Sequence, residues 1–260
     1  MRGRWLLLSI LALGLLASAC SSRAATQPAT TKRAPATTPS GPVASPKSSP
    51  KAIAAKAVVS PTQELAAVLV AQEARSKPDA QSAPVNLVPA KTPITEERTV
   101  LPVLAAKGAW LKVRLPGRPN GHSGWITRSG TSLSITKWHL LLDLSRRELM
   151  VYRQARRVRS FKAVIGKPST PTPKGDFFVE ESLALPATDV GAPYALALSA
   201  RSDVFQEFAG GPGQIAIHGL DNIGGVPGTA VSHGCIRLAT RAIHWLAFHI
   251  APGTPVTIKG

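Results

Sequence analysis

One cysteine and two histidines near the end of the chain are the residues best suited to covalent chemistry. Cys235 and His233 lie in the run SHGCIR at 232–237, and His218 follows the apolar run IAI at 215–217. Nucleophilic catalysis by cysteine needs a thiolate, a base that generates it and donors for the oxyanion. Reference pKa values of about 8.5 for a thiol and 6.5 for an imidazole are close enough for modest fields to favour the ion pair. The cluster therefore predicts a nucleophilic thiol.

A β-sheet must position the cysteine and the two histidines, because most of the second half of the chain has the sequence pattern of β-strands. The predicted strands are Trp138 to Leu144, Glu148 to Arg153, Val158 to Ile165, Asp176 to Glu180 and Gln214 to Ile217. A single helix is expected from Arg241 to His249, with its apolar residues on one face and Pro252-Gly253 ending it. The expected fold class is mainly β.

Two separated motifs carry a family resemblance. The first is IHG at 217–219, followed after thirteen residues by HGCIRL at 233–238, and the second is GKPSTPTPKGDF at 166–177. Together they resemble the catalytic domain of L,D-transpeptidases, the YkuD family, over about 135–260. The resemblance implies a β-sandwich catalytic domain with a short helix after the catalytic cysteine.

The reaction implied by this resemblance is acyl transfer on peptidoglycan stem peptides. Cys235 would attack the carbonyl of the L-centre at position three of a tetrapeptide donor, expel D-Ala and form a thioester. A side-chain amine of another stem would resolve the thioester and give a 3-3 cross-link, whereas water would give L,D-carboxypeptidase activity. No cofactor or metal is implied, and carbapenems are expected to inactivate the enzyme by acylating Cys235.

The resemblance also assigns roles to the histidines. His218 is the general base or thiolate partner of Cys235. A backbone carbonyl beside Gly219 or the carboxylate of Asp221 would orient its ring, and the sequence leaves both acceptors open. His233 is expected in the substrate pocket, where it would orient groups around the cysteine.

Further residues are expected around the substrate. Arg237 would fix local structure or bind the stem carboxylates, and Ser232, Gly234 and the Cys235 N–H are candidates for the oxyanion. Tyr194 is predicted to line the substrate site, although packing explains a tyrosine there equally well.

Two other classes of function compete with the transpeptidase. A zinc hydrolase would recruit His218, His233 and Cys235, but no motif such as HExxH is present. A non-catalytic wall-binding lipoprotein would also fit the modular organisation described below, and retention of both His218 and Cys235 argues against it.

The N-terminus has the layout of a secretory signal. Arg2 and Arg4 precede an apolar run from Trp5 to Leu16, followed by small residues and Cys20. Residues 1–19 are therefore predicted to be a signal peptide, with Cys20 lipidated as in bacterial lipoproteins; cleavage by ordinary signal peptidase is the alternative. The protein is expected outside the cytoplasm, anchored in the membrane and facing the cell wall.

A Pro/Ala/Thr/Lys-rich linker is predicted for 20–84. Its first forty residues contain six basic residues and no acid, a composition typical of a disordered tether. A helix is predicted at 61–76, with Ser60 as N-cap and Leu65 and Val68 on one face.

Short apolar runs separated by turn residues predict a small β domain at 85–134. The strands expected there are Thr99 to Leu104, Trp110 to Leu115 and Trp125 to Arg128. The pieces WLKV at 110–113 and GWI at 124–126 resemble bacterial SH3-like domains, small β-barrels that bind wall material or pack against an adjoining enzyme.

Composition limits the partners. The 260 residues carry a net charge of +17, aromatic residues make up only 5%, and there are two cysteines. These counts exclude a disulfide-stapled miniprotein and a four-thiolate zinc module. For an exported chain, a basic balance points to anionic headgroups and wall polymers and away from nucleic acid.

Overall fold

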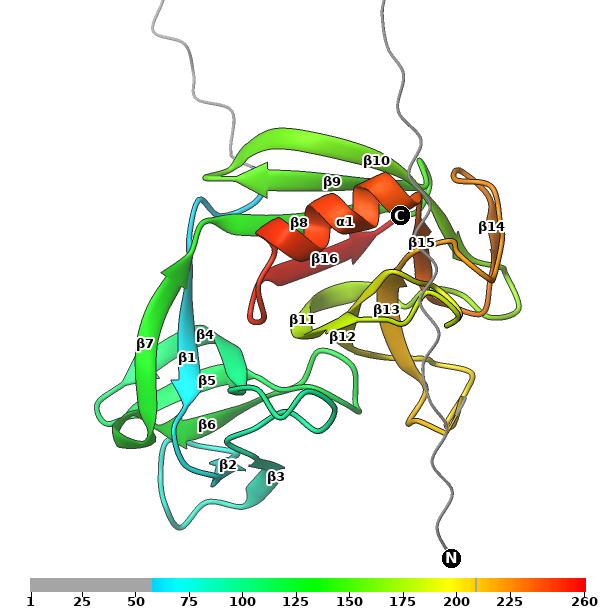
Figure 1. The fold of residues 1–260 in the computed structure, drawn as a ribbon. Helices are drawn as coiled ribbons and strands as arrows, with labels where there is room; N and C mark the ends of the chain where they lie inside the picture. The colour runs from blue at the N-terminus through cyan, green and yellow to red at the C-terminus, as the bar shows by residue number, and fades with distance from the viewer. Residues whose placement is uncertain (1–57, 209) are drawn as a thin grey trace, which may run out of the picture. The chain divides into compact units, whose positions relative to one another are not determined.

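The computed structural model describes residues 58–208 and 210–260, and their fold is mainly β (Figure 1). Strands make up 50% of the described residues and helix makes up 6%, which confirms the predicted mainly β fold class. The strands form a seven-stranded and a nine-stranded sheet that belong to the same compact part of the chain. The predicted signal peptide, Cys20 and most of the predicted linker lie outside the described residues.

The first sheet is built from consecutive strands between residues 63 and 136. Its strands are β1 (Gln63–Val68), β2 (Gln72–Arg75), β3 (Pro84–Val88), β4 (Val100–Lys107), β5 (Trp110–Arg114), β6 (Ser123–Thr127) and β7 (Thr131–Thr136). Their order is β3-β2-β6-β5-β4-β1-β7, and every pairing is antiparallel. Alternate residues of β5, Leu111 and Val113, are fully buried in its core, as the period of two predicts.

The prediction of a helix at 61–76 is wrong, because strands β1 and β2 occupy that span. Leu65 and Val68 suit one face of a helix, but β1 pairs with both β4 and β7, so its backbone is satisfied by neighbouring strands. The linker therefore ends earlier than residue 84. The small β domain also begins before residue 85, because β1, β2 and the start of β3 belong to it.

The second sheet carries the cysteine and histidine motifs. Its strands are β8 (Trp138–Asp143), β9 (Glu148–Arg153), β10 (Arg156–Gly166), β11 (Gly175–Ala184), β12 (Tyr194–Arg201), β13 (Gln214–His218), β14 (Ala230–Ser232), β15 (Ile236–Leu238) and β16 (Pro255–Lys259). Their order is β14-β10-β15-β13-β12-β11-β16-β8-β9. The long strand β10 also pairs with β9, so the expected sandwich closes on itself through this strand.

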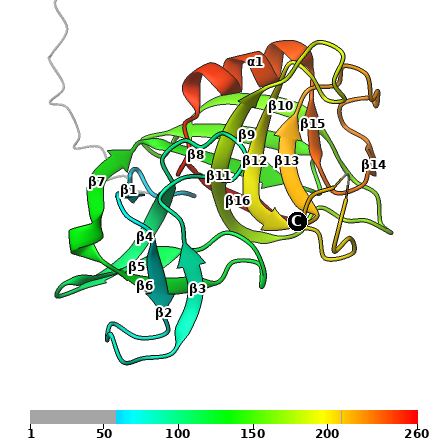
Figure 2. The same ribbon diagram turned by 60° about the horizontal axis from the view of Figure 1, so that its bottom comes forward.

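The predicted helix after the cysteine is confirmed as α1 (Thr240–His249). It buries Ala242, Ile243 and Leu246 in the core enclosed by the second sheet. Figure 2 shows α1 lying over this sheet, with β12, β13 and β15 side by side beneath it. The apolar face of β12 and β13 is thereby used for packing, which leaves their other face for the polar motif residues.

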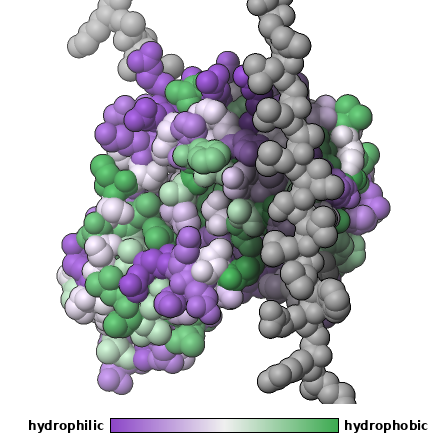
Figure 3. All heavy atoms as spheres, viewed as in Figure 1, coloured by the Kyte–Doolittle hydropathy of each residue, from purple (hydrophilic) through white to green (hydrophobic). Residues whose placement is uncertain are grey.

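Arginines cluster at the hairpin between β9 and β10. Arg153, Arg156, Arg157 and Arg159 are exposed, and Figure 3 shows hydrophilic side chains gathered over this hairpin at the upper left. The Arg153 and Arg159 guanidinium groups lie 5.3 Å and 5.6 Å from the ring centroids of Trp138 and Trp245. Cation–π contacts therefore help to order two of these arginines.

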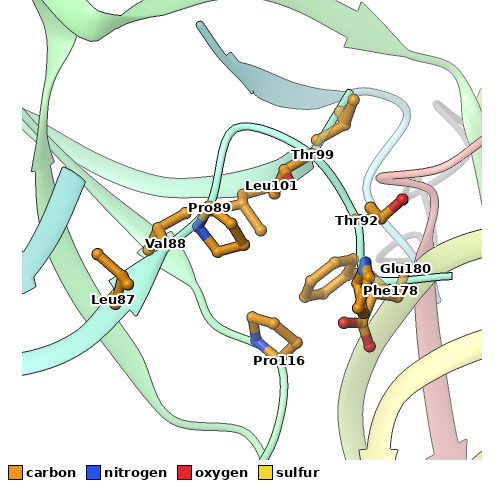
Figure 4. A pocket seen from close by; sticks show the side chains of 11 residues that line it. Leu87, Val88, Pro89, Thr92, Thr99, Leu101, Pro116, Phe178 and Glu180 are labelled. Atoms are coloured by element: carbon orange, nitrogen blue, oxygen red, sulfur yellow. The ribbon is translucent and has the colours of Figure 1, made fainter. Parts of the chain in front are cut away.

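The two sheets meet at β11. Phe178, a residue of β11, is 1% exposed and belongs to the core of the first sheet. The Glu181 carboxylate accepts hydrogen bonds from the backbone N–H groups of Ile94 (3.2 Å) and Thr95 (2.7 Å). A pocket at this junction is lined by residues of both sheets, among them Leu87, Val88, Pro116, Phe178 and Glu180 (Figure 4). It contains none of the predicted site residues.

Candidate active site

Cys235 ends the three-residue connection between β14 and β15. Gly234 in this turn has φ of +120°, a region that residues with a side chain rarely adopt. The Ser232 hydroxyl donates to the Cys235 carbonyl oxygen (2.6 Å) and accepts from the Gly234 N–H (3.1 Å). These bonds hold the main chain on both sides of the thiol in one conformation.

The proline-rich loop at 167–174 braces the same turn. The Thr170 hydroxyl donates to the Ser232 carbonyl oxygen (3.1 Å), and the Thr172 hydroxyl donates to the Gly234 carbonyl oxygen (2.8 Å). Thr172 also accepts a hydrogen bond from the Gly166 N–H (2.9 Å). The two motifs that carry the family resemblance are therefore joined through buried hydroxyl groups, and the second motif positions the first.

His218 is the last residue of β13, and its ring is held in one orientation. Its Nδ1 lies 2.8 Å from the Gly219 carbonyl oxygen, which can only accept, so Nδ1 carries the proton and Nε2 has the free lone pair. A Cβ at Gly191 would collide with the imidazole, so this glycine allows the backbone to pack on the ring. The Asp221 carboxylate instead accepts from the Thr240 hydroxyl (2.9 Å). Of the two open acceptors, the carbonyl orients His218.

The strand register brings the thiol and the imidazole to one face of the sheet. β13 and β15 are parallel, with Ile217 opposite Ile236 and His218 opposite Arg237. Cys235 immediately precedes β15, so alternation places its side chain on the same face as Arg237 and His218. Neighbouring strands lie about 4.8 Å apart and each residue advances about 3.3 Å, so the two side chains start close enough to meet.

Burial acts on the two groups in opposite directions. It raises the pKa of the Cys235 thiol, and a backbone hydrogen bond with Ala216 and the charge of Arg237 oppose this rise. Burial lowers the pKa of His218; the Gly219 hydrogen bond opposes this fall and Arg237 adds to it. Both shifts favour the uncharged forms, a neutral thiol and a neutral imidazole. The ion pair suggested by the reference values is therefore not favoured at rest, and His218 is suited to act as a base.

Arg237 is a buried cation beside this pair. Its side chain is mostly inaccessible, and one Nη donates to the Gly224 carbonyl oxygen (3.2 Å). Its Nε has no hydrogen-bond partner within the described residues. The Arg237 side chain is thus tied to the main chain at Gly224, and its Nε leaves capacity for an anionic group.

Three of the predicted substrate residues are used elsewhere. Tyr194 lies on the opposite face of the sheet, where its ring contacts His244 and Phe248 of α1 at 5.1 Å and 6.0 Å, so packing explains it. The Ser232 hydroxyl and the Gly234 N–H bond to each other within the turn. Both groups are therefore engaged within the turn, and their role at an oxyanion stays a prediction.

His233 is exposed and lies against two aromatic rings that the sequence analysis missed. Its ring centroid is 6.0 Å from that of Phe205 and 5.9 Å from that of Phe208. Both phenylalanines belong to the loop 202–213, which joins β12 to β13. Two phenylalanines within four positions of a polar loop, in a chain with six in all, are the signal that could have pointed to them.

Neither a metal cluster nor a membrane-spanning helix occurs in the part of the chain that the structure describes. Within 58–208 and 210–260, no three His, Cys, Asp or Glu side chains are placed to hold an ion together. Over the same residues, no helix has the length and apolar character needed to cross a bilayer. The described residues therefore contain no group of side chains that would serve as ligands for the zinc hydrolase considered above.

The sequence around this site matches a known family. Residues 137–258 match the family model of the L,D-transpeptidase catalytic domain, YkuD. The match contains His218, His233 and Cys235 and falls within 135–260, the segment for which the motifs predicted the resemblance.

Two curated relatives match the same part of the chain, and solved structures were also compared with it. The chain is 32% identical over 121 residues to the YkuD protein of Bacillus licheniformis, named a candidate L,D-transpeptidase, covering 46% of this chain and 65% of that protein. Its counterpart in Bacillus subtilis, named in the same way, is 30% identical over 122 residues, covering 47% and 66%. The chain thus spans slightly less than two thirds of these relatives. An L,D-transpeptidase structure from Mycobacterium smegmatis covers 62% of this chain and 82% of its own, with 19% identity and a TM-score of 0.39.

Proposed function

We propose that this protein is a peptidoglycan L,D-transpeptidase that forms 3-3 cross-links by cysteine acyl transfer. The observation that carries the proposal is the placement of Cys235 and His218 on one sheet face, with His218 Nδ1 held by a carbonyl and Nε2 without a bond within the described residues. The family match over residues 137–258 supplies the substrate class.

The proposed reaction has two halves. His218 Nε2 takes the thiol proton while the sulfur attacks the carbonyl of the L-centre at position three of a tetrapeptide stem. The Cys235 N–H is the predicted donor that the turn bonds leave for the oxyanion. The intermediate collapses, the amine of D-Ala takes the proton from His218, and a thioester remains. A neutral diamino-acid side-chain amine then attacks the thioester and gives its proton to His218. The C–S bond breaks, the departing sulfur takes this proton back from His218, and the thiol and the neutral imidazole are restored.

Product analysis tests this function. The full mature chain is mixed with a disaccharide-tetrapeptide and examined by intact mass and by chromatography of the muropeptides. We expect a protein adduct with the mass of the stem minus D-Ala, and a 3-3 dimer in solution. Acylation of the same thiol by a carbapenem is expected to block both products.

Other outcomes would favour the other candidate functions. A tripeptide product without dimer would identify an L,D-carboxypeptidase, because water would then resolve the thioester. A folded protein with a free thiol that forms no adduct would argue for a non-catalytic wall-binding protein.

We further propose that the chain is exported and anchored in the membrane through lipidated Cys20, with an SH3-like module at 63–136. The support is the signal layout at 1–19, the small residues before Cys20 and the basic tether after it. Replacing Cys20 with serine is expected to move the protein from the membrane fraction to the soluble fraction and to remove the acyl mass. A wild-type N-terminus without lipid would instead establish cleavage by ordinary signal peptidase.

A further inference from the structure

We propose that Arg118 of the seven-stranded sheet is a positioning residue for the active site, because it holds the loop 202–213 whose rings flank His233. The inference rests on the proposed function and assigns the seven-stranded sheet a part in it. The hydrogen bonds that support it cross from one sheet to the other.

The Arg118 guanidinium binds three carbonyl oxygens of this loop. One Nη donates to Pro212 (3.0 Å), and the other donates to Ser202 (2.9 Å) and Phe205 (2.8 Å). These acceptors come from the beginning, the middle and the end of the loop. A planar guanidinium can serve several acceptors at fixed angles, which the single ammonium of a lysine does less well.

Asn120, in the same turn between β5 and β6, fixes the point where the loop begins. Its side-chain amide donates to the Arg201 carbonyl oxygen (2.7 Å) and accepts from the Arg201 N–H (2.8 Å). The same amide donates to the Asp203 carboxylate (3.0 Å), and the Gly117 N–H donates to the Ser199 carbonyl oxygen (3.1 Å). The turn of the first sheet therefore binds along the end of β12.

The nine-stranded sheet also holds the two ends of the loop. Glu180 pairs with the Arg201 guanidinium (3.2 Å) and accepts from the Gln214 amide (2.8 Å), one residue on each side of the loop. This buried cluster is a second support for the ends, in addition to Asn120. Arg118 binds the body of the loop, the part between Ser202 and Pro212 that contains Phe205 and Phe208. Its loss should therefore release this body and leave the ends in place.

The body of the loop contacts the active site through the rings of two phenylalanines. The Phe205 carbonyl oxygen accepts a hydrogen bond from Arg118, and the Phe205 ring contacts the His233 ring. The Phe208 ring contacts the same histidine. Only Gly234 separates His233 from Cys235. A donor stem bound at Cys235 therefore lies next to a wall whose position depends on Arg118. Small displacements of substrate-positioning groups cost up to about 100-fold in rate.

The test compares Arg118→Ala and Arg118→Lys with the matched control Arg98→Ala in the full mature chain. Arg98 also donates to two carbonyl oxygens, Val68 (3.2 Å) and Leu69 (3.1 Å), but both lie within its own sheet. The measurements are the second-order rate constant for acylation of Cys235 by the tetrapeptide donor, the rate of thiol alkylation by iodoacetamide, and amide hydrogen exchange of residues 202–213.

We expect Arg118→Ala to slow acylation by about 10- to 100-fold, mainly through KM, and to leave thiol alkylation unchanged. Exchange within 202–213 should accelerate, Arg118→Lys should restore part of the rate, and Arg98→Ala should match the wild type. In a Phe205→Ala background the Arg118 effect should largely disappear, because both changes act through the same loop.

Two results would overturn the inference. Unchanged exchange in 202–213 would show that Arg118 does not hold the loop, and this readout needs no substrate. Equal losses in acylation and alkylation would place the effect on the thiol itself. A wild type that forms no adduct would count against the proposed function, while the exchange experiment would still decide whether Arg118 holds the loop. If the alanine variant does not fold, the lysine variant gives the same comparison.

Discussion

Replacing Cys235 with alanine is expected to abolish adduct formation, 3-3 dimer formation and carbapenem acylation. The reason is that Cys235 carries the only thiol in the described residues and stands on the same sheet face as His218. Intact-mass measurement of the full mature chain after incubation with the tetrapeptide donor checks this result.

The loss can be assigned to chemistry because the turn does not depend on the thiol. Ser232, Thr170 and Thr172 bond to main-chain atoms of the turn, so Cys235→Ala and Cys235→Ser should keep the wild-type melting temperature. Cys235→Ser should also remain inactive, because a hydroxyl is far less acidic than a thiol. Full activity in a folded Cys235→Ala variant would disprove the proposed mechanism.

Replacing His218 with glutamine is expected to lower the rate of acylation by about 10²- to 10⁴-fold, the range typical of a lost general base. The wild-type rate should also depend on pH. Only the neutral imidazole accepts the thiol proton, and burial lowers the pKa of His218 below its ordinary 6.5. The acylation rate should therefore rise with pH through a midpoint below 6.5, and this limb should be absent in His218→Gln.

A matched control comes from His139, a histidine of β8 whose pKa burial also lowers. Its Nε2 contacts the Thr257 hydroxyl at 3.0 Å, so it takes no part in the Cys235 site. His139→Gln should retain both the rate and the acid limb. An acid limb that persists in His218→Gln, or that vanishes in His139→Gln, would contradict the assignment of the base.

The local sequence was sufficient for the features that depend on short-range patterns. The spacing of Ile243 and Leu246, ended by Pro252-Gly253, predicted α1, because a helix is formed by bonds within the segment itself. The motifs around His218 and Cys235 likewise marked the residues that we propose to react, because few residue types can act as nucleophile and base.

The sequence failed where partner strands decided the conformation. Residues 63–75 fit an amphipathic helix, but their backbone pairs with strands far along the chain, and no local pattern encodes that choice. Tyr194 was predicted at the substrate site because the local sequence does not show which face of the sheet its side chain occupies. Its side of the sheet follows from the register of β12 against β13, which places it under α1.

By itself the sequence determined the mainly β class and singled out the proposed nucleophile and its histidine, because residue chemistry and periodicity are properties of short segments. Only the tertiary structure decided which acceptor orients His218, which face holds Tyr194 and how Arg118 reaches the loop 202–213. The Asp221 contact with Thr240, the Tyr194 contact with α1 and the Arg118 contact with the loop join separate segments. Their closeness is set by sheet pairing and by packing between sheets, since hydrogen-bond partners in a sheet can lie anywhere along the chain.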